Sequence, residues 1–220
     1  MLLPNFIDAT RYTPVFTTEG ILAQEELRFI RKSVKKGEFF FFPKEKHRYT
    51  YHIVNGLVRL YISSRDGIEK TLHYHAPETQ FGFQGFKRDG TTRMTAVAVT
   101  DCEVLAIDYV DLLAFCDRHT NYYLAYIEYL FQIMSSLVDD VESLSFEVGA
   151  RRLASLLYAL AVSYNMKITY SIDELASIIG THRNTVTNAL SHFRSKGYLA
   201  KQQRSIVITD LEGLNRYIQG

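Results

Sequence analysis

The chain has 220 residues, of which 47% are hydrophobic and 22% are charged, and its net charge of +1 is ordinary for a globular protein of one or two domains. No segment approaches the roughly 18 apolar residues of a membrane span, and the first residues lack the features of a secretory signal. Two cysteines, Cys102 and Cys116, are too few for a disulfide framework or a metal cluster. We therefore expect a cytoplasmic protein with no membrane partner and no metal.

The first part of the chain is expected to form a small antiparallel β-barrel or jelly roll. Residues 22–34 favour a short amphipathic helix, after which short apolar segments alternate with glycine turns. Asn55 and Gly56 indicate a β-hairpin, because both residues tolerate positive φ. No long helix interrupts the strands, which argues against a parallel α/β sheet. The predicted strands are residues 39–42, 51–54, 57–62, 68–74, 92–99 and 103–107.

A long helix is predicted from Thr120, a suitable N-cap, to about Ser145. Apolar residues follow one another along it in alternating steps of four and three, which is the repeat of a two-stranded coiled coil. They are Tyr123, Ile127, Leu130, Met134, Leu137, Val141, Leu144 and Val148. The alternative is a helix that packs on its own barrel, as we expect for Tyr126, Phe131 and Ile133. We predict both kinds of contact, and therefore a homodimer.

The last third of the chain is basic, which favours nucleic-acid binding. Residues 148–220 contain nine Lys or Arg and four Asp or Glu, a net charge of +5, whereas the rest of the chain has a net charge of −4. A mostly apolar helix is predicted over residues 148–164, and a helix-turn-helix follows it. Ser171 and Glu174 form a predicted capping box at the start of its first helix, and Gly180 is expected to end that helix.

The second helix of this motif, predicted to begin near His182, has a polar outer face without acidic residues. Arg183 is expected to pair with guanine, and Asn184 and Asn188 with neighbouring bases, because such side chains read base edges in the major groove. Residues 199–209 favour two strands around a basic turn, the wing. The alternative is an ordinary helical hairpin with a solvated face. The predicted DNA-binding residues are Thr181, His182, Arg183, Asn184, Thr187, Asn188, Ser191, Arg194, Lys201 and Arg204.

The order of these motifs resembles that of the CRP/FNR family of bacterial transcription regulators. The matching segments are residues 51–72, 101–108, 150–157 and 171–208. The resemblance implies an α+β fold with an effector-sensing β-roll (residues 1–119), a dimerisation helix (120–147) and a winged helix-turn-helix (148–220). It implies a homodimeric regulator controlled by a small-molecule effector. The implied partners are double-stranded DNA with a near-palindromic operator and RNA polymerase.

The predicted effector pocket departs from that of the family's cyclic-nucleotide-binding members, which use a Gly-Glu-Leu turn and an Arg-Ser/Thr-Ala strand start. Here the turn at residues 81–86 has no carboxylate, and Arg93 falls out of register. We therefore do not expect cyclic AMP, and the three phenylalanines of the turn favour an apolar or aromatic effector. The alternative is that these rings fill the barrel core of a constitutive regulator. The candidate effector-binding residues are Tyr74, Phe81, Phe83, Gln84, Arg93 and Tyr126.

One branch of the family, the aromatic-sensing regulators of halorespiration, resembles this chain in residues 4–6 and 70–82. That resemblance implies a phenolic effector, and a phenolate needs a positive partner. Residues 121–150 contain no Lys or Arg. The partner would have to come from elsewhere, with Lys87, Arg88 and Arg93 as candidates.

No cofactor and no enzymatic activity are expected. The lack of cysteine before Cys102 excludes a four-cysteine iron–sulfur cluster, and the pocket turn lacks the haem ligands of a carbon monoxide-sensing relative. His73 and His75 have no third ligand nearby. No nucleophile triad, carboxylate pair or phosphate loop is evident. Two alternatives stay open, a haem- or redox-responsive regulator and a ligand-binding dimer whose winged helix contacts protein.

Overall fold

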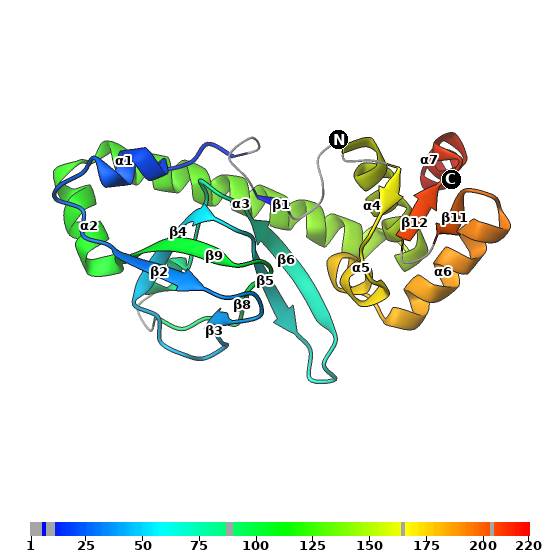
Figure 1. Ribbon diagram of the computed structural model, residues 1–220, viewed down its shortest axis with the longest axis horizontal. Helices are drawn as coiled ribbons and strands as arrows, with labels where there is room; N and C mark the ends of the chain where they lie inside the picture. The colour runs from blue at the N-terminus through cyan, green and yellow to red at the C-terminus, as the bar shows by residue number, and fades with distance from the viewer. Residues whose placement is uncertain (1–5, 8–11, 87–89, 164–165, 203–204) are drawn as a thin grey trace. The chain divides into compact units, whose positions relative to one another are not determined.

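The computed structural model describes residues 6–7, 12–86, 90–163, 166–202 and 205–220 (Figure 1). Contacts between residues divide the chain into two compact units. We call residues 6–62 with 72–136 the β-roll unit, and residues 63–71 with 137–220 the C-terminal unit. Strand β6 (Glu69–His75) and helix α3 (Asn121–Phe146) contribute residues to both units. None of the described helices is both long and apolar enough to cross a membrane.

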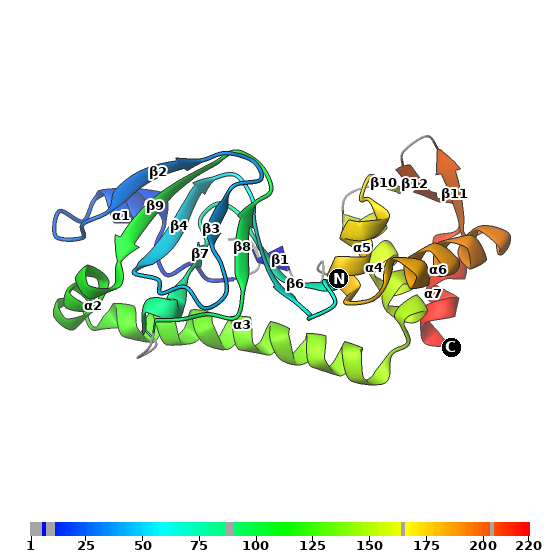
Figure 2. The same ribbon diagram turned by 90° about the horizontal axis from the view of Figure 1, so that it is seen from below.

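The β-roll unit contains two sheets, with the strand orders β1-β6-β5-β8-β3 and β2-β9-β4-β7 (Figure 2). The strands of the first sheet, besides β6, are β1 (Phe6–Ile7), β3 (Phe39–Phe41), β5 (Val58–Ser63) and β8 (Thr95–Ala98). Those of the second sheet are β2 (Ile30–Val34), β4 (Tyr49–Asn55), β7 (Gln80–Phe81) and β9 (Cys102–Asp108). The long antiparallel ladder between β4 and β9 runs from the pair Tyr49–Asp108 to the pair Asn55–Glu103. The short strand β1 pairs parallel with β6, whereas β2, β4 and β7 to β9 pair antiparallel, which confirms the predicted antiparallel roll.

The predicted Asn55-Gly56 hairpin is wrong, because the two flanking strands do not pair. Strand β4 lies in one sheet and β5 in the other, so the turn carries the chain from sheet to sheet. Gly56 has a φ of 98°, and a Cβ there would lie 2.5 Å from the carbonyl oxygen of Asp101. The glycine was therefore correctly identified as a turn residue, but the turn is a corner of the roll and not a hairpin loop.

The helix predicted over residues 22–34 is also wrong. A short helix, α1 (Thr18–Leu22), ends where the predicted helix was to begin. Residues 30–34 instead form β2, which pairs antiparallel with β9 from Ile30–Ala106 to Val34–Cys102. The ladder with β9, more than 60 residues away in sequence, overrides the local apolar spacing.

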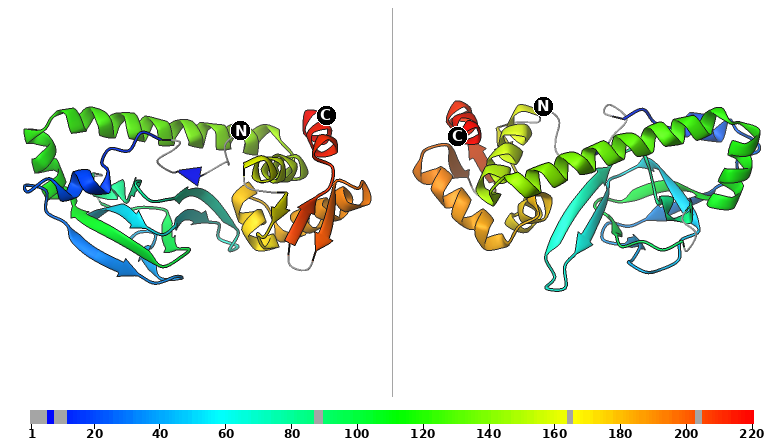
Figure 3. Two further views of the ribbon diagram at one scale, coloured as in Figure 1. Left: turned by 45° about the horizontal axis from the view of Figure 1, so that its top comes forward. Right: turned by 180° about the vertical axis from the view of Figure 1, so that it is seen from behind.

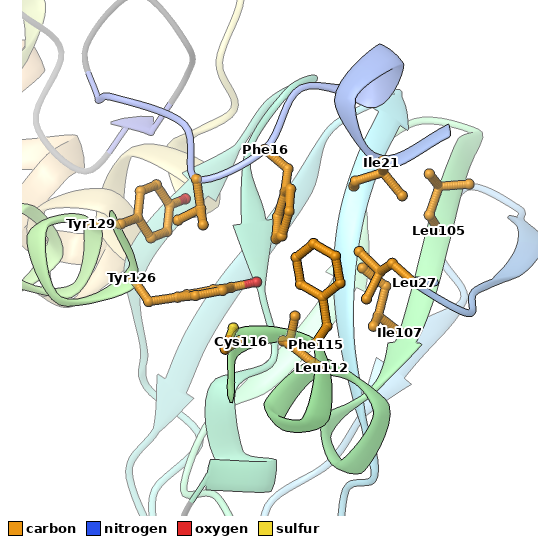
Figure 4. Close-up of a cluster of buried hydrophobic side chains, with 11 residues drawn as sticks. Phe16, Ile21, Leu27, Leu105, Ile107, Leu112, Phe115, Cys116, Tyr126 and Tyr129 are labelled. Carbon is orange, nitrogen blue, oxygen red and sulfur yellow. The ribbon is translucent and has the colours of Figure 1, made fainter. Parts of the chain in front are cut away.

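Two apolar clusters form the core of the β-roll unit. The inner cluster lies between the two sheets and contains residues of both, among them Phe41, Tyr51, Leu60, Phe81 and Val104. The outer cluster covers the other face of β9, where α1, α2 (Tyr109–Arg118) and the first half of α3 pack together (Figures 2 and 4). Figure 4 shows side chains converging from these elements, from β9 and from the segments before and after α1: Phe16, Ile21, Leu27, Leu105, Ile107, Leu112, Phe115, Cys116, Tyr126 and Tyr129. Helix α2 had no counterpart in the predicted elements.

The C-terminal unit combines helices with a small sheet. Its helices, after the second half of α3, are α4 (Gly149–Ser163), α5 (Ile172–Ile179), α6 (Arg183–Ser195) and α7 (Leu211–Gln219). Its sheet has the order β10-β12-β11, with β10 at Lys167–Ile168, β11 at Leu199–Gln202 and β12 at Ser205–Ile208. Strands β11 and β12, orange to red in Figure 3, form the predicted wing. The helices that precede and include the motif were predicted to within about two residues, and α7 was not predicted.

Candidate DNA interface and effector site

Local signals position the two helices of the C-terminal motif. The Ser171 hydroxyl accepts a hydrogen bond from the Glu174 amide at 3.2 Å, and the Glu174 carboxylate accepts one from the Ser171 amide at 2.7 Å. This is the predicted capping box. Gly180 ends α5 in the left-handed region with a φ of 64°, as predicted. The turn then places His182 at the N-cap of α6, which begins at Arg183.

Helix α6 is amphipathic in the way the sequence indicated. Its inner side chains Val186, Ala189, Leu190 and Phe193 are buried, which fixes the rotation of the helix about its axis. The predicted DNA-binding residues on the opposite face are exposed, apart from Thr181, which is half-buried. The exposed ones are His182, Arg183, Asn184, Thr187, Asn188, Ser191, Arg194 and the wing residue Lys201. Arg204 lies outside the described residues.

An ion pair across the motif was not predicted. Nη1 of Arg183, the first residue of α6, donates to both carboxylate oxygens of Asp173 at 2.9 and 2.7 Å. Asp173 lies in the first turn of α5, and both side chains are well exposed. The acidic first turn of α5 was visible in the sequence, but only the packing of α5 against α6 brings this carboxylate to the arginine.

A groove with a volume of about 520 Å³ lies between the start of α5, α6 and the wing. Polar side chains of Ser171 and Glu174 line it together with the basic groups of Arg194 and Lys201. Two of the predicted DNA-binding residues, Arg194 and Lys201, therefore share one concave surface. Basic side chains of this kind commonly contact phosphate oxygens of DNA.

Residues 63–71 contribute a partly buried cation to the C-terminal unit. Nζ of Lys70 lies 3.1 Å from the Asp140 carboxylate and donates to the Ile178 carbonyl at 2.9 Å. The neighbouring Thr71 hydroxyl is 2.8 Å from that of Ser177. Burial lowers the pKa of Lys70, although Asp140 acts in the opposite direction. These contacts fix the position of the last turn of α5. A positive charge there also interacts favourably with the helix dipole.

Arg152 holds the same end of α5 from another side. Its guanidinium Nε donates to the Ile179 carbonyl at 3.0 Å, and its Nη1 donates to the Glu147 carbonyl. Two cations, from β6 and from α4, thus satisfy carbonyl groups that a helix end leaves without partners. Neither contact was evident in the sequence, because the partners are backbone atoms of residues 27 and 108 positions away.

The candidate effector-binding residues do not all lie together. Phe81 belongs to the inner cluster, where its ring stacks on Tyr51. Phe83, in the short 3-10 turn η1 (Phe83–Phe86), points instead to α3, with its ring 6.1 Å from that of Tyr126. Tyr74 is buried, whereas Arg93 is exposed. The phenylalanines of this turn are therefore divided between the roll interior and the surface of α3.

Uncharged polar groups are buried where η1 and β7 meet α3. The Tyr129 hydroxyl donates to the Gln80 carbonyl at 3.0 Å and accepts from the Gln80 amide. Burial raises the pKa of Tyr126 well above its usual value, so its hydroxyl stays protonated. Gln84 is 7% exposed, and its side-chain amide has no hydrogen-bond partner among the described residues. We call Gln80, Gln84, Tyr126 and Tyr129 the amide–phenol cluster.

No Lys or Arg is among the buried residues of the β-roll unit that the structure describes, although Nε of the half-buried Arg59 is covered. The buried polar side chains are threonines, histidines, glutamines and one aspartate, with no Lys or Arg. Burial lowers the pKa of His52 to about 4 and that of His75 well below its ordinary value, so both are neutral at pH 7. Over the same residues no group of three metal-binding side chains occurs. Lys87 and Arg88 lie outside the described residues.

Exposed apolar side chains follow α3 at steps of three and four. We call this set the α3 stripe: Leu124, Ile127, Phe131, Met134, Val138 and Val141. Phe131, which was predicted to pack on the roll, is 59% exposed, and that prediction is wrong. Tyr126 and Ile133 do pack against the outer cluster, as predicted.

The predicted repeat and the α3 stripe share three positions, Ile127, Met134 and Val141. At the positions between these three, the repeat and the stripe differ by one residue. The repeat has Leu130, which is 40% exposed, where the stripe has Phe131, which is 59% exposed. The difference has a simple cause. Tyr126 and Tyr129 are buried against the outer cluster, which turns the helix so that Leu124 and Phe131 face outward.

The sequence matches two family models and several curated proteins. The model "Cyclic nucleotide-binding domain" matches residues 31–119, and "Crp-like helix-turn-helix domain" matches residues 151–217. The chain is 29% identical over 170 residues to the cyclic AMP receptor protein of Thermus thermophilus, covering 77% of this chain and 79% of that protein. It is 24% identical over 200 residues to the anaerobic regulatory protein of Haemophilus influenzae, covering 84% of this chain and 74% of that protein.

The fold also matches that of solved structures. A CooA mutant from Carboxydothermus hydrogenoformans superposes with a TM-score of 0.73 at 22% identity, over 94% of this chain and 98% of that one. Together with the roll, the long helix and the winged helix-turn-helix, these matches identify the chain as a DNA-binding transcription regulator with an effector-binding domain. The chain belongs to the CRP/FNR family of bacterial transcription regulators.

Proposed function

We propose that the protein is a homodimeric transcription regulator that reads a near-palindromic operator through α6 and responds to an uncharged small molecule. The observation that carries the DNA-reading role is the exposed polar face of α6, which lies beside a groove lined by Arg194 and Lys201. Arg183 would pair with guanine, and Asn184 and Asn188 would read neighbouring bases. The residues that would contact phosphates are Thr181, His182, Ser191, Arg194, Lys201 and Arg204.

The α3 stripe supports the homodimer. A row of six exposed apolar side chains along one helix is costly in water and has the spacing of a coiled-coil seam. A second copy would cover it with the same residues, giving a two-fold axis and two recognition helices. Half-sites should then lie roughly 34 Å apart on the DNA. RNA polymerase is the further protein partner that we propose.

The buried groups of the β-roll unit support an uncharged effector. A cyclic nucleotide or a phenolate carries a negative charge, which is costly to bury without a cation. The one arginine among the candidate residues, Arg93, is exposed. Gln84 and Tyr126 offer neutral donors and acceptors, and Phe83 offers an aromatic surface. A neutral aromatic molecule with a hydroxyl or amide group fits this chemistry, and a strongly acidic halogenated phenol does not.

Selection of the full-length chain against a library of random duplexes tests the DNA-reading role. Enriched sites should be near-palindromic, and the logarithm of affinity should fall steeply with that of salt concentration. No enrichment, with flat salt dependence, would favour the alternative in which the winged helix contacts protein. Native mass spectrometry of protein purified from its own host tests the rest. We expect a dimer that carries a small neutral organic mass, and a monomer would contradict the role of the α3 stripe.

A further inference from the structure

We propose that Asp173 is a specificity-determining residue of the DNA interface, and that it acts by positioning the Arg183 guanidinium. This inference rests on the proposed DNA-reading function. It concerns an acidic residue of α5, outside the set expected to touch DNA, whose carboxylate pairs with a basic side chain of α6. Three features of the ion pair support it.

The first feature is the part of the guanidinium that Asp173 uses. Both carboxylate oxygens accept from Nη1 of Arg183, at 2.9 and 2.7 Å. The Nε–H and Nη2–H groups form the other edge of the guanidinium, and this edge donates to no protein group that the structure describes. Guanine presents two neighbouring acceptors, N7 and O6, which need two parallel donors. The edge left free by Asp173 supplies such a pair of donors.

The second feature is the place of Arg183 in the fold. It is the first residue of α6, and its side chain is 61% exposed, so packing does little to restrict its rotamers. An unrestrained arginine pays conformational entropy whenever it pairs with a base. It can also swing to the nearest phosphate, which every DNA sequence offers. A carboxylate on the neighbouring helix restricts both motions.

The third feature is that Asp173, unlike its neighbour, takes no part in the capping box of α5. Its neighbour Glu174 completes the capping box, whereas the carboxylate of Asp173 bonds only to Arg183 among the described residues. The pair is well exposed, and exposed ion pairs add little to folding stability. A carboxylate near DNA repels phosphates and weakens binding to every sequence. Its expected benefit is selectivity, gained by penalising non-specific contacts.

The test compares full-length variants on the site obtained by selection with the wild-type chain. The variants are Asp173→Asn, Arg183→Ala and the double variant, and Glu212→Gln removes one charge from α7 as the control. Asp173→Asn should bind random DNA several-fold more tightly and lose up to about fivefold in discrimination at the base pair that Arg183 reads, which is what an exposed ion pair can contribute. The double variant should discriminate no worse there than Arg183→Ala. Glu212→Gln should leave discrimination unchanged.

Two results would overturn the inference. The first is that Asp173→Asn binds every sequence more tightly with discrimination intact, which would make Asp173 a general repulsive charge. The second is that Arg183→Ala relaxes no base pair although the wild type selects a site. Failure of the wild type to select any site would instead contradict the proposed function. Thermal unfolding of Asp173→Asn should match that of the wild type, so that any loss of discrimination reflects the interface and not the fold.

Discussion

The partly buried ion pair between Lys70 and Asp140 should contribute to the stability of the C-terminal unit. Their side chains are 13% and 14% exposed, and Nζ of Lys70 also donates to the Ile178 carbonyl. Replacing Lys70 by Met removes the cation and leaves the partly buried carboxylate without it. Breaking a fully buried pair costs about 3–5 kcal/mol, and the remaining exposure here lowers the expected loss to about 2–3 kcal/mol.

Urea unfolding followed by circular dichroism measures this loss. A second variant, Lys70→Met with Asp140→Leu, removes both charges and should be within about 1 kcal/mol of the wild type, because apolar replacement of a buried pair is often neutral. Lys35→Met is the matched control. Its ion pair with Asp101 is exposed, and no measurable change is expected. A loss of less than about 0.5 kcal/mol in the free energy of unfolding of Lys70→Met would refute the reasoning. Removing one partner of a desolvated pair leaves the other charge poorly solvated, which costs more than this.

Four further predictions follow from the described contacts. His52 has its pKa lowered by burial to about 4, so the folded chain binds fewer protons than the unfolded chain below pH 6.5. Stability should fall by about 2 kcal/mol between pH 7 and pH 5, and His52→Gln should reduce that slope in urea titrations; an unchanged slope would contradict the assignment. Met134→Glu should make the protein monomeric by light scattering, whereas Glu142→Gln should leave it dimeric. Gln84→Leu should stabilise the ligand-free chain by about 1 kcal/mol in urea, and a loss of that size would show that the amide has a partner within the protein. Gly56→Ala should cost about 2–4 kcal/mol, because its φ is 98° and Asp101 is too close for a Cβ. Gly67→Ala, with a φ of 77° and open space, should cost less.

The helix-turn-helix could be predicted in detail because its signals are local. The capping box joins residues three apart, and Gly180 adopts a conformation that depends on its own lack of a side chain. The outward face of α6 followed from helical spacing alone. Each of these signals acts within about one helical turn. Neighbouring residues therefore contain all the information that the prediction needed.

The β-roll shows where local information ends. The alternation of short apolar segments predicted strands, and the absence of long helices predicted an antiparallel roll. Local residues did not predict how the strands pair. Asn55-Gly56 connects two sheets instead of forming a hairpin, and residues 30–34 form a strand that pairs with β9. A strand is stabilised by its neighbours, and those neighbours come from distant parts of the chain.

The candidate sites show the same difference between local signals and contacts with distant segments. The residue types that read DNA could be named from one helix, whereas the partner of Arg183 comes from another helix and the cation at the end of α5 comes from a strand about 100 residues earlier. The repeat along α3 was visible in the sequence, but its exposed row depended on which side packs against the outer cluster. Spacing along a helix defines candidate faces. Only tertiary packing decides which of them is buried, because burial depends on the surface that a distant segment presents.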